Sequence, residues 1–132
     1  MQITAQINSS FNRVSTLIHH GLETKSVLLP PKTEGIGSAM NGAELLLLSL
    51  ATCYCHTIYR GAQHMNIGIK EIAVSVNGDF SGPVPEMEAL TFSVQVRSSA
   101  TDQQLQELIG YADLHATIPN LLRKGSQISL RA

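Results

Sequence analysis

The stretch Asn41-Gly-Ala-Glu-Leu-Leu-Leu-Leu-Ser-Leu-Ala-Thr-Cys53 decides the fold of this 132-residue chain. It is rich in strong helix formers, so we expect a helix over residues 43–65, with Asn41 as the N-cap and Gly68 just past the end. The first half of this helix is apolar on nearly all sides, which is typical of a helix buried on several faces. In so short a chain it would lie between a sheet and a second subunit.

The composition is that of a globular protein with few charges. Apolar residues make up 43% of the chain and charged residues 14%, and the net charge is −1. This balance disfavours binding to nucleic acid, and the low charge favours a homodimer that covers apolar surface. The longest apolar stretch, residues 45–58, is shorter than the roughly 20 residues that span a bilayer. Residues 1–10 lack the pattern of a secretion signal. We therefore expect a cytoplasmic protein with no membrane partner.

A loose alternation in the first segment, and β-branched and apolar residues in the next two, predict three strands before the long helix. They cover residues 2–8, 13–18 and 24–29. A turn at His19-His20-Gly21 separates the second strand from the third, and Pro30-Pro31 ends the third. The segment that follows, up to the start of the helix, contains three glycines and is expected to be a loop.

Two longer strands are predicted after the helix, over residues 71–80 and 90–97, each with apolar side chains on one face. Thr101-Asp-Gln-Gln104 resembles a capping box, and it opens a helix with an apolar stripe. The remaining features are a short helix over residues 120–124 with Pro119 in its first turn, a stop at Gly125 and a closing strand over residues 127–130. This order predicts a single α+β domain over residues 1–132.

Two motifs resemble those of the OsmC/Ohr family of hydroperoxide-detoxifying proteins. The stretch that ends at Cys53 is similar to the family's Asn-Pro-Glu-x-Leu-Leu-x-Ala-x-x-Ala-x-Cys. The stretch Ala116-Thr-Ile-Pro-Asn120 is similar to its Cys-Pro-Val-x-Asn, and the likeness extends from about Leu22 to Leu130. The resemblance implies an OsmC-like α+β fold with antiparallel sheets, a long central cysteine-bearing helix and an intertwined homodimer whose active sites use both subunits.

The resemblance also implies a catalytic role for Cys53, which would attack a small organic hydroperoxide and become a sulfenic acid. Only a thiolate is a competent nucleophile, and the family stabilises it with an arginine from an N-terminal strand and with a glutamate. Arg13 is the arginine closest to that position. The glutamate position falls on Ala43, and we expect the neighbouring Glu44 to cap the helix or complement its dipole instead.

The family's second cysteine falls on Ala116, so turnover would require an external thiol reductant. The resemblance therefore leaves two functions open. One is reduction of an organic hydroperoxide by Cys53. The other is a non-catalytic dimer that binds a small hydrophobic ligand.

A second candidate for the activating cation lies on the helix of Cys53 itself. His56 and Arg60, three and seven residues further on, share the helix face of Cys53, so the Arg60 guanidinium could favour the thiolate. Alternatively, Arg60 marks where the helix emerges into solvent. Cys55 points the other way and is expected to be a packing residue. The cysteines and histidines lack the paired spacing of zinc sites, so we expect no metal and no cofactor.

Overall fold

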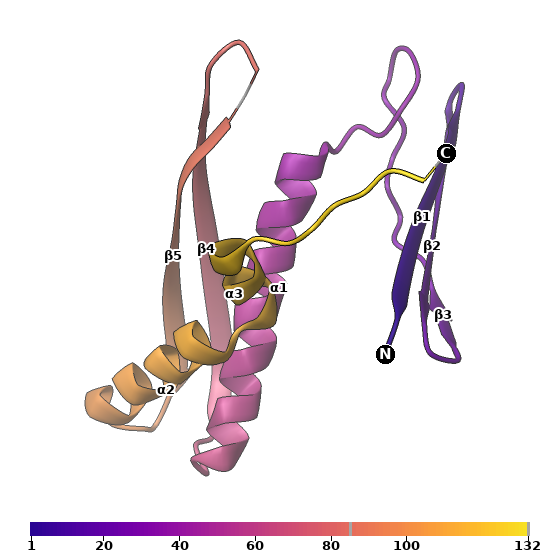
Figure 1. Ribbon diagram of the computed structural model, residues 1–132. Coiled ribbons are helices and arrows are strands. Elements are labelled where there is room, and N and C mark those ends of the chain that lie inside the picture. Colours follow the sequence, from indigo (N-terminus) through magenta and orange to yellow (C-terminus); the bar gives the residue numbers. More distant parts are fainter. Residues whose placement is uncertain (85, 132) are drawn as a thin grey trace. The chain divides into compact units, whose positions relative to one another are not determined.

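The computed structural model describes residues 1–84 and 86–131, and it divides into two compact units, Met1–Leu45 and Leu46–Ala132 (Figure 1). The helices and strands confirm an α+β fold with antiparallel sheets and one long helix. In chain order they are β1 (Ile3–Ser10), β2 (Arg13–His20), β3 (Glu23–Lys25), α1 (Gly42–His64), β4 (Ile69–Ser81), β5 (Glu86–Ser98), α2 (Asp102–His115) and α3 (Thr117–Lys124). Among the described helices, none is both long and apolar enough to cross a membrane.

The N-terminal unit is built on an antiparallel sheet in the order β1-β2-β3. Its third strand ends at Lys25, so the prediction of a strand over residues 24–29 is wrong beyond that point. The reason lies in Thr16, whose hydroxyl accepts a hydrogen bond from the Val27 backbone N–H at 2.8 Å and donates one to the Val27 carbonyl at 2.7 Å. A side chain thus replaces the strand ladder at Val27.

Helix α1 begins with a reciprocal cap that confirms the predicted roles of Asn41 and Glu44. The Glu44 N–H donates to Asn41 Oδ1 at 2.9 Å, and the Asn41 N–H donates to Glu44 Oε1 at 3.0 Å. The two side chains thereby satisfy backbone donors that the first turn of a helix leaves without partners. The Glu44 carboxylate is therefore engaged at the start of the helix.

In the C-terminal unit, α1 lies along one face of the antiparallel pair β4–β5, where Val74 is opposite Val94 (Figure 1). The predicted strand faces and the apolar stripe of α2 are confirmed, because these side chains meet in one core. The buried members of that core are Tyr54, Ile58, Ala62, Leu108, Ala112 and Ala116.

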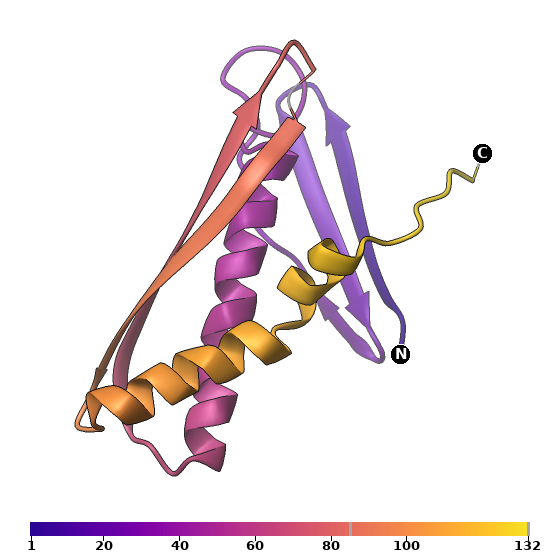
Figure 2. The ribbon, with the colours of Figure 1, turned by 60° about the vertical axis from the view of Figure 1, so that its left-hand side comes forward.

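Helix α2 crosses the C-terminal half of α1, where a glycine permits close contact (Figure 2). A Cβ at Gly61 would lie 2.6 Å from Cδ1 of Tyr111 and 2.9 Å from Cδ1 of Leu108. The absence of a side chain at Gly61 is therefore what lets the two helices pack at this distance. The predicted capping box opens α2, since the Thr101 hydroxyl accepts from the Gln104 N–H and the Gln104 side chain accepts from the Thr101 N–H.

Helix α3 is longer than the sequence indicated, because it begins at Thr117 rather than at residue 120. Pro119 stands in its first turn and Gly125 ends it with a φ of 77°, both as predicted. The prediction of a strand over residues 127–130 is wrong. Ile128 and Leu130 are 94% and 93% exposed, and no neighbouring strand pairs with this segment within residues 1–84 and 86–131.

Candidate functional site

Cys53 lies on α1 as a half-buried free thiol that packs against the core of the C-terminal unit. Its carbonyl accepts a hydrogen bond from the Thr57 hydroxyl at 2.8 Å. Within residues 1–84 and 86–131, no hydrogen bond or ion pair involves the Cys53 sulfur. The position of the sulfur is thus determined by packing. That a cation stabilises the Cys53 thiolate stays a prediction.

The two predicted cations occupy different units. Arg60 is exposed on α1, seven residues after Cys53, with His56 exposed between them. Arg13 is exposed at the start of β2, where it lines a 700 Å³ hollow within the N-terminal unit, whereas Cys53 belongs to the C-terminal unit. The role of either arginine toward Cys53 therefore stays a prediction.

Cys55 is half-buried and lines a small hollow of about 270 Å³ beside Val74. Cys53 packs against the core cluster and Cys55 does not, so the two thiols have different surroundings. This difference makes Cys55 a natural internal control for experiments on Cys53.

Ala116 is fully buried and belongs to the same core against which Cys53 packs. It stands between the end of α2 at His115 and the start of α3 at Thr117, so the junction of these helices belongs to the core that also contains Tyr54 and Ile58 of α1. Ala116 thus belongs to the core cluster, and Cys53 packs against that cluster. The correspondence of Ala116 to the family's second cysteine remains an expectation from the sequence.

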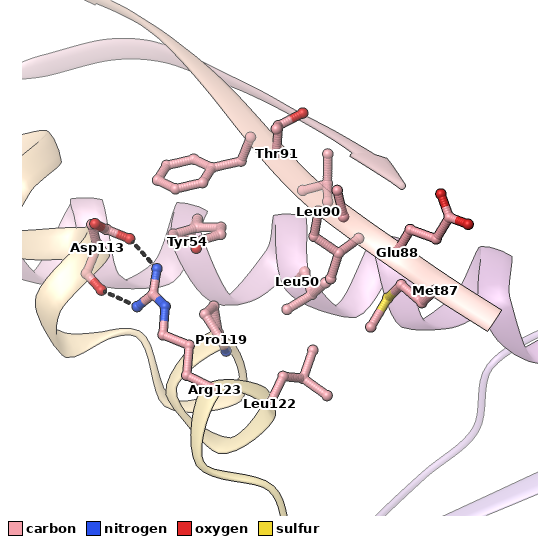
Figure 3. A pocket seen from close by; sticks show the side chains of 13 residues that line it. Leu50, Tyr54, Met87, Glu88, Leu90, Thr91, Asp113, Pro119, Leu122 and Arg123 are labelled. Carbon is pink, nitrogen blue, oxygen red and sulfur yellow. Dashed lines mark hydrogen bonds and ion pairs between the residues drawn. The ribbon is translucent and has the colours of Figure 1, made fainter. Parts of the chain in front are cut away.

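The main cavity of the C-terminal unit has a volume of about 490 Å³ and lies between α1, the β4–β5 pair and the α2–α3 segment (Figure 3). Most of its wall is apolar. The lining residues are Leu50, Tyr54, Val76, Met87, Glu88, Ala89, Leu90, Thr91, Phe92, Asp113, Pro119, Leu122 and Arg123. Cys53 is not among them.

One end of this cavity is polar because Arg123 forms an ion pair there with Asp113. The Arg123 side chain donates to the Asp113 carboxylate at 2.5 Å and to the Asp113 carbonyl at 3.0 Å, as Figure 3 shows. It also donates to Oδ1 of Asn120 at 2.9 Å. These contacts tie α3 to the end of α2, and the hydrogen bond to Asp113 raises the pKa of Arg123. A half-exposed ion pair therefore stands at this end of the cavity.

Tyr54 places a hydroxyl beside this ion pair. The residue is only 4% exposed, and its ring stacks on that of Phe92. Burial raises the pKa of Tyr54 above its ordinary value of 10.0, an effect that the nearby Arg123 charge partly opposes. The phenol therefore stays protonated at neutral pH and can both donate and accept a hydrogen bond.

The polar end of the cavity is the part of the site that sequence reasoning missed. Tyr54 continues the helical spacing of Leu50 and Ile58, which is a signal for a core residue and not for a polar site. Asp113 and Arg123 lie on different helices, ten residues apart, so no local pattern links them. Only the packing of α3 beside α2 reveals their ion pair.

A family model described as OsmC-like protein matches residues 35–131 of this chain. That span includes all of α1 and every element after it. No curated protein shows a significant match to the sequence.

Solved structures share the fold at low sequence identity. An OsmC-like protein from Mycoplasma pneumoniae has a TM-score of 0.66 and 19% identity, with 92% of this chain and 86% of that chain covered. An OsmC-like hydroperoxide resistance protein from Jannaschia has a TM-score of 0.56 and 14% identity, with 96% and 87% covered. An organic hydroperoxide resistance protein OsmC from Legionella pneumophila has a TM-score of 0.59 and 16% identity, with 93% and 90% covered.

Proposed function

Because the chain belongs to the OsmC-like protein family, we propose that it reduces small organic hydroperoxides with the Cys53 thiol. The observation that carries the proposal is the position of Cys53, a half-buried thiol on α1 that packs against the cluster containing Ala116. Two proteins of similar fold are named for hydroperoxide resistance, which supports the same chemistry here.

The reaction has two stages. In the first, the Cys53 thiolate attacks the outer oxygen of the hydroperoxide, an S–O bond forms and the O–O bond breaks. The sulfur is oxidised to a sulfenic acid, and the released alkoxide takes a proton and leaves as the alcohol. Arg13 or Arg60 is the proposed cation that favours the thiolate, since a nearby positive charge stabilises the ionised sulfur.

The second stage restores the thiol with an external thiol reductant. Its sulfur attacks the sulfenic acid and displaces water, which leaves a mixed disulfide on Cys53. A second molecule of the reductant then attacks that disulfide, releases the oxidised reductant and returns Cys53 to the thiol. Position 116, in the core cluster against which Cys53 packs, is an alanine and carries no thiol, which supports resolution by a thiol from outside the chain.

We further propose that the working form is an intertwined homodimer. Leu48 and Tyr59 of α1 are 57% and 45% exposed, a large apolar exposure for a helix that otherwise supplies the core. A second subunit would remove these side chains from water. Sedimentation of the purified chain tests this proposal, since a monomer at micromolar concentration would contradict it.

The test of the catalytic proposal is consumption of cumene hydroperoxide in the presence of dithiothreitol. We expect turnover by the native protein, none by Cys53→Ser and near-native turnover by Cys55→Ser, because Cys53 packs against the core cluster that contains Ala116 and Cys55 does not. Circular dichroism establishes that each variant is folded. Turnover that survives in folded Cys53→Ser would contradict the proposal.

A second candidate function is supported by the cavity, whose wall is mostly apolar and does not include Cys53. In this alternative, the protein binds a small hydrophobic ligand and performs no chemistry. A protein that binds such a ligand but consumes no hydroperoxide, with or without Cys53, would favour this alternative over the reductase.

A further inference from the structure

We infer that Asn120 and Arg123 are positioning residues for Cys53. Their side chains fasten α3 to the carboxyl end of α2, and they thereby hold the junction of these helices, at Ala116, in the core cluster against which Cys53 packs. This inference deepens the proposed function by naming what controls access to the Cys53 thiol, and it rests on that function for its biological meaning. Access itself can be measured without hydroperoxide chemistry.

Two successive carbonyl groups at the end of α2 accept hydrogen bonds from side chains of α3. The Arg123 guanidinium donates to the Asp113 carbonyl at 3.0 Å, and the Asn120 side-chain amide donates to the Leu114 carbonyl at 2.8 Å. The last carbonyls of a helix have no partner within the helix, so these two side chains cap α2. The positive charge of Arg123 also complements the dipole at this end of α2.

The capping side chains are joined to each other and to a carboxylate. Arg123 donates to Oδ1 of Asn120 at 2.9 Å and to the Asp113 carboxylate at 2.5 Å. Figure 3 shows the guanidinium directed at Asp113. We call Asp113, Asn120 and Arg123 the α2–α3 clamp. The side chains of its ion pair are about half exposed, 51% for Arg123 and 48% for Asp113, so dissolved salt can weaken the clamp.

Helix α3 has few other contacts that would hold it in place. Pro119 is its buried residue, whereas the segment from Leu121 to Lys124 is exposed. A helix of eight residues is marginal in water unless tertiary contacts stabilise it. The position of α3 therefore depends on the α2–α3 clamp.

The clamp lies next to the part of the core that contacts Cys53. Ala116 is fully buried, directly precedes α3 and belongs to the cluster against which Cys53 packs. Figure 3 also shows the Arg123 guanidinium beside Tyr54, the residue that follows Cys53. Loss of the clamp would therefore loosen the packing around Cys53 and expose its sulfur. Cys55 does not pack against this cluster, so its exposure would stay the same.

Alkylation by iodoacetamide tests the inference, with Cys53 and Cys55 followed separately by peptide mass spectrometry. We expect Arg123→Met to raise the rate at Cys53 at least about fivefold, in line with the loss of hydrogen bonds from a charged group, and to leave the rate at Cys55 unchanged. The factor should be the same from about pH 7 to about pH 9, because it reflects access and not the thiolate fraction. Lys124→Met removes a neighbouring exposed charge and should change neither rate.

Two further measurements test the clamp even if Arg123→Met is unstable. Asn120→Ala leaves the ion pair of Arg123 and Asp113 in place and should raise the rate at Cys53 about threefold. An increase in NaCl from about 0.05 M to about 1 M screens a half-exposed ion pair. It should raise the rate at Cys53 about twofold in the native protein and not in Arg123→Met.

Three results would overturn the inference. They are an unchanged rate at Cys53 in Arg123→Met and Asn120→Ala, equal increases at Cys53 and Cys55, and an effect of Lys124→Met equal to that of Arg123→Met. Failure of the proposed function is a separate result. Alkylation that depends on the clamp, without hydroperoxide turnover, would reject the reductase alone. Turnover by the native protein, with alkylation that does not depend on the clamp, would reject this inference alone.

Discussion

The ring of Tyr54 on α1 stacks on the ring of Phe92 on β5, with 3.8 Å between the ring centroids and 17° between the ring planes. This contact fixes the rotation of α1 about its axis against the strand pair. Because Tyr54 directly follows Cys53, the stack also determines where the Cys53 side chain points. The same ring holds the Tyr54 hydroxyl at the polar end of the cavity.

The stack should contribute strongly to stability. We expect Tyr54→Ala to lower the free energy of unfolding by about 3 kcal/mol, because it leaves a large cavity in the core and removes an aromatic pair. Gln63→Ala, on an exposed part of the same helix, should lower it by less than about 1 kcal/mol. Urea unfolding followed by circular dichroism measures both values. Equal losses for the two variants would show that the stack does not anchor α1.

Stability should fall at alkaline pH because of Tyr54. Burial raises the pKa of this phenol above 10.0, so the unfolded chain loses the proton first. Between the unfolded and folded pKa values the unfolded state binds fewer protons, and the free energy of unfolding therefore decreases as pH rises. Below pH 10 the contribution of Tyr54 is fully present.

The check is the urea midpoint measured from about pH 8 to about pH 11, a window that brackets the ordinary tyrosine pKa. Tyr54→Phe should show a shallower decline than the native protein. Parallel curves for the two proteins would mean that the Tyr54 hydroxyl does not resist ionisation.

Two glycines should respond to alanine in opposite directions. A Cβ at Gly61 would meet the side chains of Tyr111 and fully buried Leu108, so Gly61→Ala should destabilise the protein by about 1–3 kcal/mol. Gly110 on α2 has no atom within 4 Å of such a Cβ, so Gly110→Ala should stabilise it by about 0.5–1 kcal/mol through helix propensity. Thermal unfolding distinguishes the two signs. A stabilising Gly61→Ala would show that α1 and α2 are not in close contact.

The elements that sequence reasoning identified correctly are those with strong local signals. The Asn41 cap, the Thr101 capping box and the alternation of Ile72, Val74 and Val76 each depend on neighbouring residues, and each appears in the structure as predicted. Residues 127–130 alternate in the same way but form no strand. Alternation reports which residues could share a face, whereas a strand also requires a neighbour to supply hydrogen bonds.

The candidate site was predictable only in part. The motif identifies Cys53, and the structure packs it against the core cluster that contains Ala116. The Arg123–Asp113 pair and the Tyr54 hydroxyl could not be anticipated, because they meet through the packing of three separate helices. No periodic pattern in the sequence predicts such long-range contacts.

The most direct test of the central claim is to trap the oxidised sulfur. The native protein is treated with one equivalent of cumene hydroperoxide in the presence of dimedone, and the modified residue is located by peptide mass spectrometry. We expect a dimedone adduct on Cys53 and none on Cys55, since the sulfenic acid forms on the attacking thiol. If the folded protein leaves Cys53 unmodified, the proposal that this thiol reduces hydroperoxides is wrong.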